Sequence, residues 1–180
     1  VSDAGWNALA YEGLLAIRDQ LGAEIAQVEV HNPGQFEDGF RDFAQRAEAL
    51  GFDALWVSEH FVVAGHYGTA WMSPLLCLTY AASVTTRIRL ATGVLVLPYY
   101  HPLTLARQIQ TLSSLSQGRF VLGLGSQIKP HIEKRFSMPW SHPAARMREM
   151  ILAIRAIWEC WDNGTKLDFR GEFYKHTLMT

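Results

Sequence analysis

An α/β fold built on a parallel sheet is predicted by the way strand-like and helix-like segments alternate along the chain. Short apolar runs rich in β-branched or aromatic residues recur at 52–57, 88–96 and 120–124. The segments between these runs repeat apolar residues at helical spacing, and Gly, Asn or Pro stands at many of the junctions. Strands that alternate with helices pair in parallel through right-handed crossovers.

Residues 87–127 form the clearest of these units. A strand-like run is followed by a helical pattern with one apolar face and then by a second strand-like run. Small or polar residues lie within the first run and directly after the second, where βα units place their binding loops. The apolar face of the helical pattern consists of Leu105, Ile109, Leu112 and Leu115.

The remaining segments extend this pattern in both directions. We expect about four βα units after an extra N-terminal helix. That number fits an open doubly wound sheet or half of an eight-unit barrel, and periodicity alone does not separate the two. The expected elements are helix 1–21, strand 23–30, helix 36–50, strand 52–57, helix 74–84, a polar loop 128–140, helix 143–162 and a short hairpin 166–174.

Composition argues against several classes of function. The 180 residues are 49% hydrophobic and carry a formal net charge of −1, so no basic surface for nucleic acid is predicted. We find no transmembrane run and no signal peptide, and we therefore expect a cytoplasmic protein without membrane insertion. Cys77 and Cys160 stand in apolar helical patterns, which indicates two buried, reduced thiols rather than a disulfide.

The carboxyl ends of the expected strands carry the candidate functional residues, because parallel α/β folds bind ligands there. His60 is the most informative, since an imidazole at a strand end can act as acid, base or hydrogen-bond donor. The alternative is a solvent-facing or capping histidine. Glu59 directly precedes it and, by the alternation of a strand, faces the other way. His31-Asn32 ends the earlier expected strand.

Two glycine-containing segments shape the other strand ends. Thr92-Gly93 inside a strand pattern predicts a bulge, a feature that often lies beside a site. Gly123-Leu124-Gly125 is not a dinucleotide-binding fingerprint, because Ile128 stands where the third glycine is required. The sequence shows neither a convincing metal-ligand spacing nor a nucleophile elbow.

From about residue 45 to residue 180 the sequence resembles the luciferase-like monooxygenase superfamily. The matching stretches include RAEALGFDALWVSEHF, RIRLATGVLVLPYYHPLTLARQ, LSQGRFVLGLGSQ and RFSMPWSHPAARMREMILAIRAIW. The stretches GSQIKPHIEKRF and GEFYKHTLMT resemble actinobacterial oxidoreductases that use coenzyme F420 more than those that use FMN. The resemblance implies that residues 45–180 are the N-terminal half of a (β/α)8 TIM barrel, with the deazaflavin or flavin at the carboxyl ends of the strands.

The resemblance also implies roles for single residues. His60 matches the strand-end histidine that faces the deazaflavin ring, and it is the expected catalytic residue. Gly93-Val94 matches a bulge, often with a cis peptide bond, that supports one face of the ring. Ser126 and Gln127 match the fourth-strand positions that contact the cofactor in members of the family. The expected cofactor-binding residues are Glu59, Thr92, Gly93, Val94, Ser126 and Gln127.

Residues 1–44 do not resemble a luciferase-like amino terminus. They resemble the basic membrane lipoprotein family of substrate-binding proteins of ABC transporters, in which the segment DAGWN, here with Asp3 and Asn7, lies near the ligand. The first strand of that family is missing here, so this ligand site is expected to be incomplete. We hypothesise a chimera in which strand 23–30 and helix 36–50 replace the first βα unit of the barrel.

Three interpretations of function follow. The first is an F420-dependent, alternatively FMN-dependent, oxidoreductase that moves hydride to or from a small organic substrate. Ile128 stands where some sugar-phosphate dehydrogenases of the family have a catalytic glutamate, which argues against their mechanism and substrate. The second is a non-catalytic substrate-binding module of an ABC transporter. The third is an inactive partial barrel whose strands five to eight would follow Thr180; its exposed edges predict homo-oligomers or aggregation, and it should bind coenzyme weakly.

Overall fold

The computed structural model describes residues 6–22, 25, 36–60 and 72–178. The chain divides into two compact units, one of residues 1–40 with 61–71 and the other of residues 41–60 with 72–180. In the first unit the predicted N-terminal helix is confirmed as α1 (Trp6–Leu21). The predicted strand 23–30 lies outside the described residues except for Ile25, which is in no regular element, and so do Asp3 and His31-Asn32.

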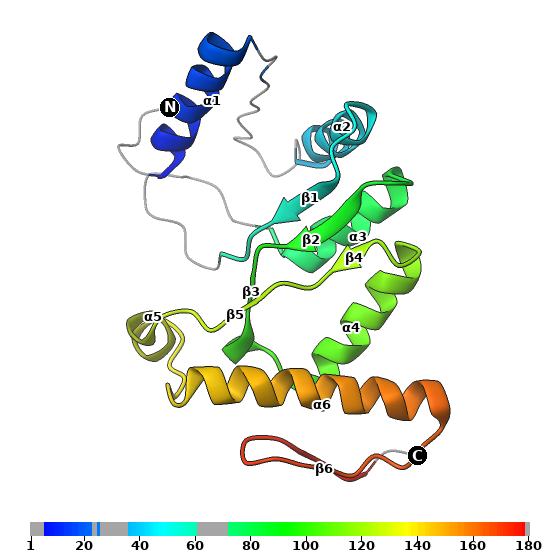
Figure 1. Ribbon diagram of the computed structural model, residues 1–180. Helices are drawn as coiled ribbons and strands as arrows, with labels where there is room; N and C mark the ends of the chain where they lie inside the picture. The colour runs from blue at the N-terminus through cyan, green and yellow to red at the C-terminus, as the bar shows by residue number, and fades with distance from the viewer. Residues whose placement is uncertain (1–5, 23–24, 26–35, 61–71, 179–180) are drawn as a thin grey trace. The chain divides into compact units, whose positions relative to one another are not determined.

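The second unit contains the predicted parallel sheet. Its strands β1 (Ala54–Val57), β2 (Arg89–Thr92) and β4 (Phe120–Val121) pair in parallel in the order β1-β2-β4. A second parallel pair, β3 (Leu95–Val96) with β5 (Leu124–Gly125), continues β2 and β4 along the chain (Figure 1). The strand-like runs 88–96 and 120–124 expected from the sequence are therefore each divided into two shorter strands.

Helices cover one face of this sheet and close the core. The predicted helices are found as α2 (Phe36–Ala49), α3 (Pro74–Val84), α4 (Pro102–Leu115) and α6 (Pro143–Asn163). α6 packs across α4, where the indole Nε1 of Trp158 donates to the carbonyl of Ala106 at 3.1 Å (Figure 1). Both predicted thiols are buried and unbridged. The largest fully buried core side chains are Leu78, Ile88, Leu90, Leu95, Leu105, Ile132, Met150 and Ile157.

The opposite face of the sheet leaves apolar side chains exposed. Trp56 of β1 is opposite Ala91 of β2, which is opposite Val121 of β4. Trp56 is 61% exposed and Val121 is 38% exposed. In the central strand both Leu90 and Ala91 are fully buried, so the exposed apolar surface of this face lies on the two flanking strands, at Trp56 and Val121.

The polar segment 128–140 differs from the expected loop, because it contains the short helix α5 (Lys129–Lys134). Ile132 is fully buried and anchors this helix. Within the six residues of this helix Ile132 is the only large apolar side chain, which is too few for a periodic signal over so short a segment. The predicted hairpin is present, with β6 (Phe169–Arg170) and β7 (Lys175–His176) in antiparallel pairing.

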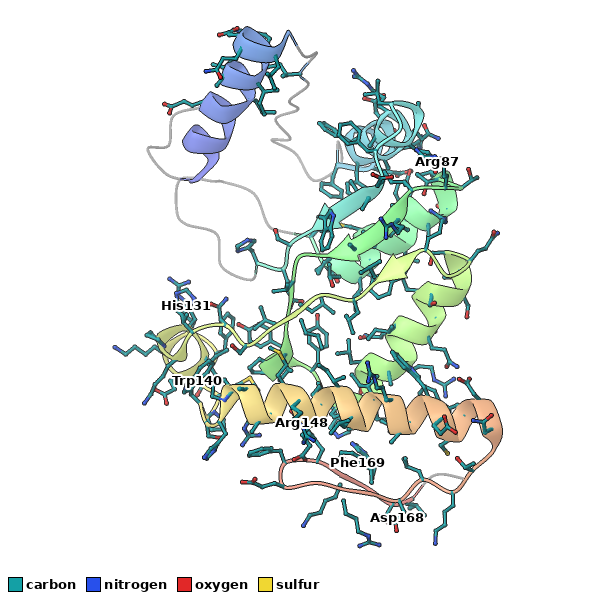
Figure 2. All side chains as sticks on the ribbon, viewed as in Figure 1. Arg87, His131, Trp140, Arg148, Asp168 and Phe169 are labelled. Carbon is teal, nitrogen blue, oxygen red and sulfur yellow. The ribbon has the colours of Figure 1, made fainter. Side chains whose placement is uncertain are left out.

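The N-terminal ends of the strands are held by two charged side chains. The carboxylate of Glu48 accepts hydrogen bonds from the backbone N–H groups of Thr86 at 2.9 Å, Arg87, and Ile88 at 2.8 Å. The guanidinium of Arg119 donates to the carbonyls of Thr85 and Ile88, each at 2.9 Å. These two side chains thus fix the N-terminal ends of the strands, which lie opposite the carboxyl ends where a ligand is expected. Figure 2 shows Arg87 near the start of β2, whereas His131 and Trp140 lie near α5.

A similar arrangement holds the turn of the hairpin. The carboxylate of Glu149, on α6, accepts backbone hydrogen bonds from Glu172, Phe173 and Tyr174 at 2.9, 2.7 and 2.6 Å. Burial acts to raise the pKa of Glu149, but these three N–H groups outweigh it and the pKa lies below its usual value. A Cβ on Gly171 would collide with this carboxylate, so a side chain there would force Glu149 to move.

Replacing Glu149 by Gln tests this contact. Because the folded-state pKa is lowered, the native carboxylate stabilises the fold above its ordinary pKa of 4.5, and that contribution is lost as the pH falls through the folded-state pKa. We expect Glu149→Gln to be less stable than the native chain at pH 7 and the gap to narrow in acid, as measured by urea denaturation. Glu133→Gln, on the exposed side of α5, is the control. A gap that is constant with pH would contradict the assignment.

Candidate functional site

The break between β2 and β3 lies at the carboxyl end of β2. The peptide bond between Gly93 and Val94 is cis, as the resemblance implied. The N–H of Gly93 still donates to the carbonyl of Val57 at 2.9 Å, so β2 stays paired with β1 up to the break. The side chain of Val94 is 40% exposed. The predicted bulge at Thr92-Gly93 is therefore a change of chain direction that presents Val94 to the surface.

The break between β4 and β5 meets the first break directly. The hydroxyl of Thr92 donates to the carbonyl of Gly123 at 3.0 Å and accepts from its N–H at 2.9 Å. The same carbonyl accepts from the N–H of Leu95 at 2.9 Å. Thr92 is fully buried. Through its two hydrogen bonds to Gly123, its side chain joins the two broken strands.

Gly123 and Gly125 make this close approach possible. A Cβ on Gly123 would collide with the carbonyl oxygen of Thr92. A Cβ on Gly125 would lie 2.5 Å from Cγ2 of Val94. From the sequence, these glycines could be interpreted as permitting backbone approach to a ligand; in the structure they permit the approach of one strand to its neighbour.

Glu59 lies just beyond β1 and bridges to the chain after β3. It is 6% exposed, and its carboxylate accepts from the N–H of Val96 at 2.6 Å and from the hydroxyl of Tyr100. Burial raises the pKa of Glu59, and the two hydrogen bonds oppose the shift only in part. Burial and the nearby carboxylate also raise the pKa of Tyr100. Tyr100 was not predicted as a site residue, because nothing in its local pattern indicates a partner so far back in the sequence.

His60 and Glu59 face differently, as the alternation predicted. Glu59 is buried and His60 is exposed. The structure thus brings Glu59, Thr92, Gly93 and Val94 into one connected cluster through β3 and Gly123, and it leaves the His60 imidazole accessible beside that cluster in the chain.

Ser126 and Gln127 continue from β5 toward α5. The backbone of Gln127 has φ of +63°, and its side-chain Oε1 accepts from the N–H of Ile128 at 3.1 Å. The same oxygen lies 3.2 Å from Nδ1 of His131. Ser126 lines a pocket of about 100 Å³ together with side chains from three later segments, namely Trp140, Arg146 and Tyr174.

Arg146 is a further candidate binding residue, because it lines the same pocket as Ser126, and the sequence did not reveal it. Its Nε donates to both the carbonyl and the hydroxyl of Ser141 at 3.0 Å. Its guanidinium carbon lies 4.3 Å from the ring centroid of Phe173. This arginine is one of several on α6, and only the packing of the hairpin distinguishes it.

The chain belongs to the luciferase-like monooxygenase family. Residues 26–180 match the family described as "Luciferase-like monooxygenase". The match begins within residues 1–44, whose resemblance to the lipoprotein family stays a prediction. Among the described residues, no helix is both long enough and apolar enough to cross a membrane.

Two curated proteins are similar to the chain over most of its length. An uncharacterized protein of Mycobacterium tuberculosis is 49% identical over 139 residues, which cover 77% of this chain and 38% of the relative. An F420-dependent glucose-6-phosphate dehydrogenase of Amycolatopsis mediterranei is 34% identical over 146 residues, covering 74% of this chain and 40% of the relative. The chain therefore spans about two fifths of the length of these curated relatives.

The solved structure of monooxygenase RslO1 from Streptomyces bottropensis has a TM-score of 0.68 and 30% sequence identity. The similarity covers 81% of this chain and 42% of that one. Together with the parallel strand order, it confirms the prediction of a partial (β/α)8 barrel of the luciferase-like type. An open doubly wound sheet, the alternative left by periodicity, is thereby excluded.

Replacing Glu59 by Gln should change how stability depends on pH. A raised folded-state pKa means that the stabilising contribution of the native group is present below its ordinary pKa of 4.5 and is lost as the pH rises through the folded-state pKa. The amide can still accept from Val96. We therefore expect the stability of Glu59→Gln relative to the native chain to increase from pH 4 to pH 7 in urea denaturation. The control is Glu12→Gln on α1, and a relative stability that falls with pH would contradict the burial argument.

Replacing Gly123 by Ala should destabilise the fold at the contact between the two broken strands. The added Cβ collides with backbone, which cannot rotate away as a side chain can, so we expect a loss of about 3 kcal/mol or more in the free energy of unfolding. Gly13→Ala is the matched control, because a Cβ there meets nothing within 4 Å and α1 should gain slightly. Equal stabilities for the two variants would show that the strands are not closely apposed at Gly123.

Proposed function

We propose that the chain carries the ring-binding part of a deazaflavin- or flavin-dependent oxidoreductase, with coenzyme F420 as the first choice and FMN as the alternative. The observation that carries the proposal is the Gly93–Val94 break, with an exposed Val94, at the carboxyl ends of parallel strands in a luciferase-like barrel. The similarity to an F420-dependent dehydrogenase supports the choice of coenzyme.

The residues present fit a planar ring. Trp56 packs against Gly93, since a Cβ on that glycine would lie 3.1 Å from Cε3 of the indole. Trp56 and Val94 are both exposed, so this part of the sheet offers apolar surface next to backbone that carries no side chain at Gly93. When bound, the ring would donate or accept hydride, while the protein supplies position and electrostatics.

Roles for the single residues follow from their exposure. His60, whose imidazole is accessible, would give or take a proton at the ring or the substrate. Val94 would support one face of the ring, and Ser126 and Gln127 would anchor it by hydrogen bonds. Glu59 and Thr92 are buried and bonded to neighbouring strands, so we assign them to positioning the Gly93–Val94 segment.

The substrate in this proposal is a small organic molecule. Although one relative is named a glucose-6-phosphate dehydrogenase, Ile128 stands where such enzymes of the family have a catalytic glutamate, so we do not extend that substrate to this chain. Association of copies through the exposed barrel edge and a cytoplasmic location stay predictions.

A fluorescence titration with coenzyme F420 and, separately, FMN tests the proposal. We expect F420 to bind with a Kd between about 100 μM and about 1 mM, since the contacts assigned here are with the ring alone, and more tightly than FMN. Val94→Glu should abolish the signal by placing a charge against the ring, whereas Leu152→Glu, a similarly exposed site on α6, should leave it unchanged.

Two outcomes would contradict the proposal. One is no binding of either coenzyme at about 1 mM, and the other is equal binding by Val94→Glu and the native chain.

His60→Ala separates catalysis from binding: F420 affinity should change by less than about twofold, whereas turnover, once a substrate is found, should fall by about 100-fold or more.

A further inference from the structure

A second candidate site lies on the helical side of the unit, between α4 and α6. Leu103 and Thr104 in the first turn of α4 form one wall, Trp161 in the last turn of α6 forms the other, and Lys166 follows that helix. The groove has a volume of about 1060 Å³, which is ample for a small molecule. Figure 1 shows α4 and α6 crossing in this region.

The charge of this groove is positive and has no counter-charge within it. Arg107 and Lys166 line it, and none of its lining residues is acidic. Across the described ranges, neither cation forms an ion pair. Of the carboxylates nearest to the lining residues in sequence, Glu159 and Asp168 are bonded to Asn163 and Arg170, each at 2.7 Å, and Asp162 is exposed and does not line the groove. An anion in the groove would therefore meet two available cations.

Arg107 is held against the wall of the groove by an aromatic ring. Its guanidinium carbon lies over the ring of Trp161, 4.5 Å from the centroid. A guanidinium has five N–H donors, and it binds a phosphate or carboxylate with two parallel hydrogen bonds. Holding the side chain in advance lowers the entropy cost of binding.

The rest of the lining suits a ligand with an apolar body. Leu103, Trp161 and the buried Cys160 supply apolar surface, and Thr104 and Gln108 supply polar groups beside the N-terminal turn of α4, where the helix dipole favours negative charge. The carboxyl end of α6 has the opposite sign, and Lys166 lies just beyond it.

We propose that this groove binds a small organic anion, with a phosphate or carboxylate between Arg107 and Lys166 and a planar or apolar body against Leu103 and Trp161. The site is separate from the strand ends and does not depend on the oxidoreductase proposal.

Calorimetric titration of the full chain with three probes tests this proposal. Phenyl phosphate carries both the anion and the ring, inorganic phosphate carries the anion alone, and phenol carries the ring alone. We expect phenyl phosphate to bind with a Kd of about 1 mM or tighter, and about tenfold more tightly than either of the other two. F420 affinity, measured in parallel, should not change when phenyl phosphate is present.

Substitutions then locate the site. Arg107→Gln and Lys166→Gln should each weaken phenyl phosphate binding by about fivefold or more, while Arg155→Gln, which removes the same charge from an exposed position of α6 outside the groove, should change it by less than about twofold. Lys166 lies in a loop, so its variant remains informative if Arg107→Gln unfolds.

Three results would overturn the proposal. They are no phenyl phosphate binding at about 10 mM, equal binding by the native chain and both groove variants, and equal affinity for phenyl phosphate and either single-feature probe.

Discussion

The second unit depends on the close contact between two broken strands, made through the hydroxyl of Thr92 and the backbone of Gly123. That hydroxyl belongs to a fully buried side chain and bonds to both the N–H and the carbonyl of Gly123. These bonds lie at the two breaks, the one between β2 and β3 and the one between β4 and β5. Because neither Gly123 nor Gly125 has a side chain, β3 and β5 can pair in parallel beyond the break, which keeps Val94 exposed beside the strand ends.

Three carboxylates in other parts of the chain bind backbone N–H groups, and the direction of their pKa shifts differs. Glu48, Glu59 and Glu149 each accept backbone N–H groups from a segment distant in sequence. Glu48 and Glu149 each accept three such bonds near the surface, and their pKa values fall despite burial that opposes the shift. Glu59 is buried and accepts one hydrogen bond from a backbone N–H and one from the phenol hydroxyl of Tyr100. Desolvation raises its pKa by more than these two bonds lower it. The number of donors and the depth of burial decide the sign.

The sequence predicted the elements better than their contacts. Helix α3 begins at Pro74 and ends at Val84 as expected, because a proline in the first turn and an apolar helical repeat are local signals. The bulge at Thr92-Gly93 was also visible locally. The role of Glu59 was not, since its partners Val96 and Tyr100 follow it by 37 and 41 residues. α5 was missed because a single buried residue, Ile132, anchors it.

The central claim is that the Thr92 hydroxyl joins the two broken strands, and hydrogen exchange in Thr92→Val tests it most directly. The substitution keeps the shape of the side chain and removes both hydrogen bonds to Gly123. We expect exchange at the amides of Gly123 and Leu95 to accelerate by about tenfold or more, while amides in the middle of α6 are unaffected. Thr111→Val, which removes a hydroxyl bonded within α4, is the control. Unchanged protection at Gly123 and Leu95 would contradict the account.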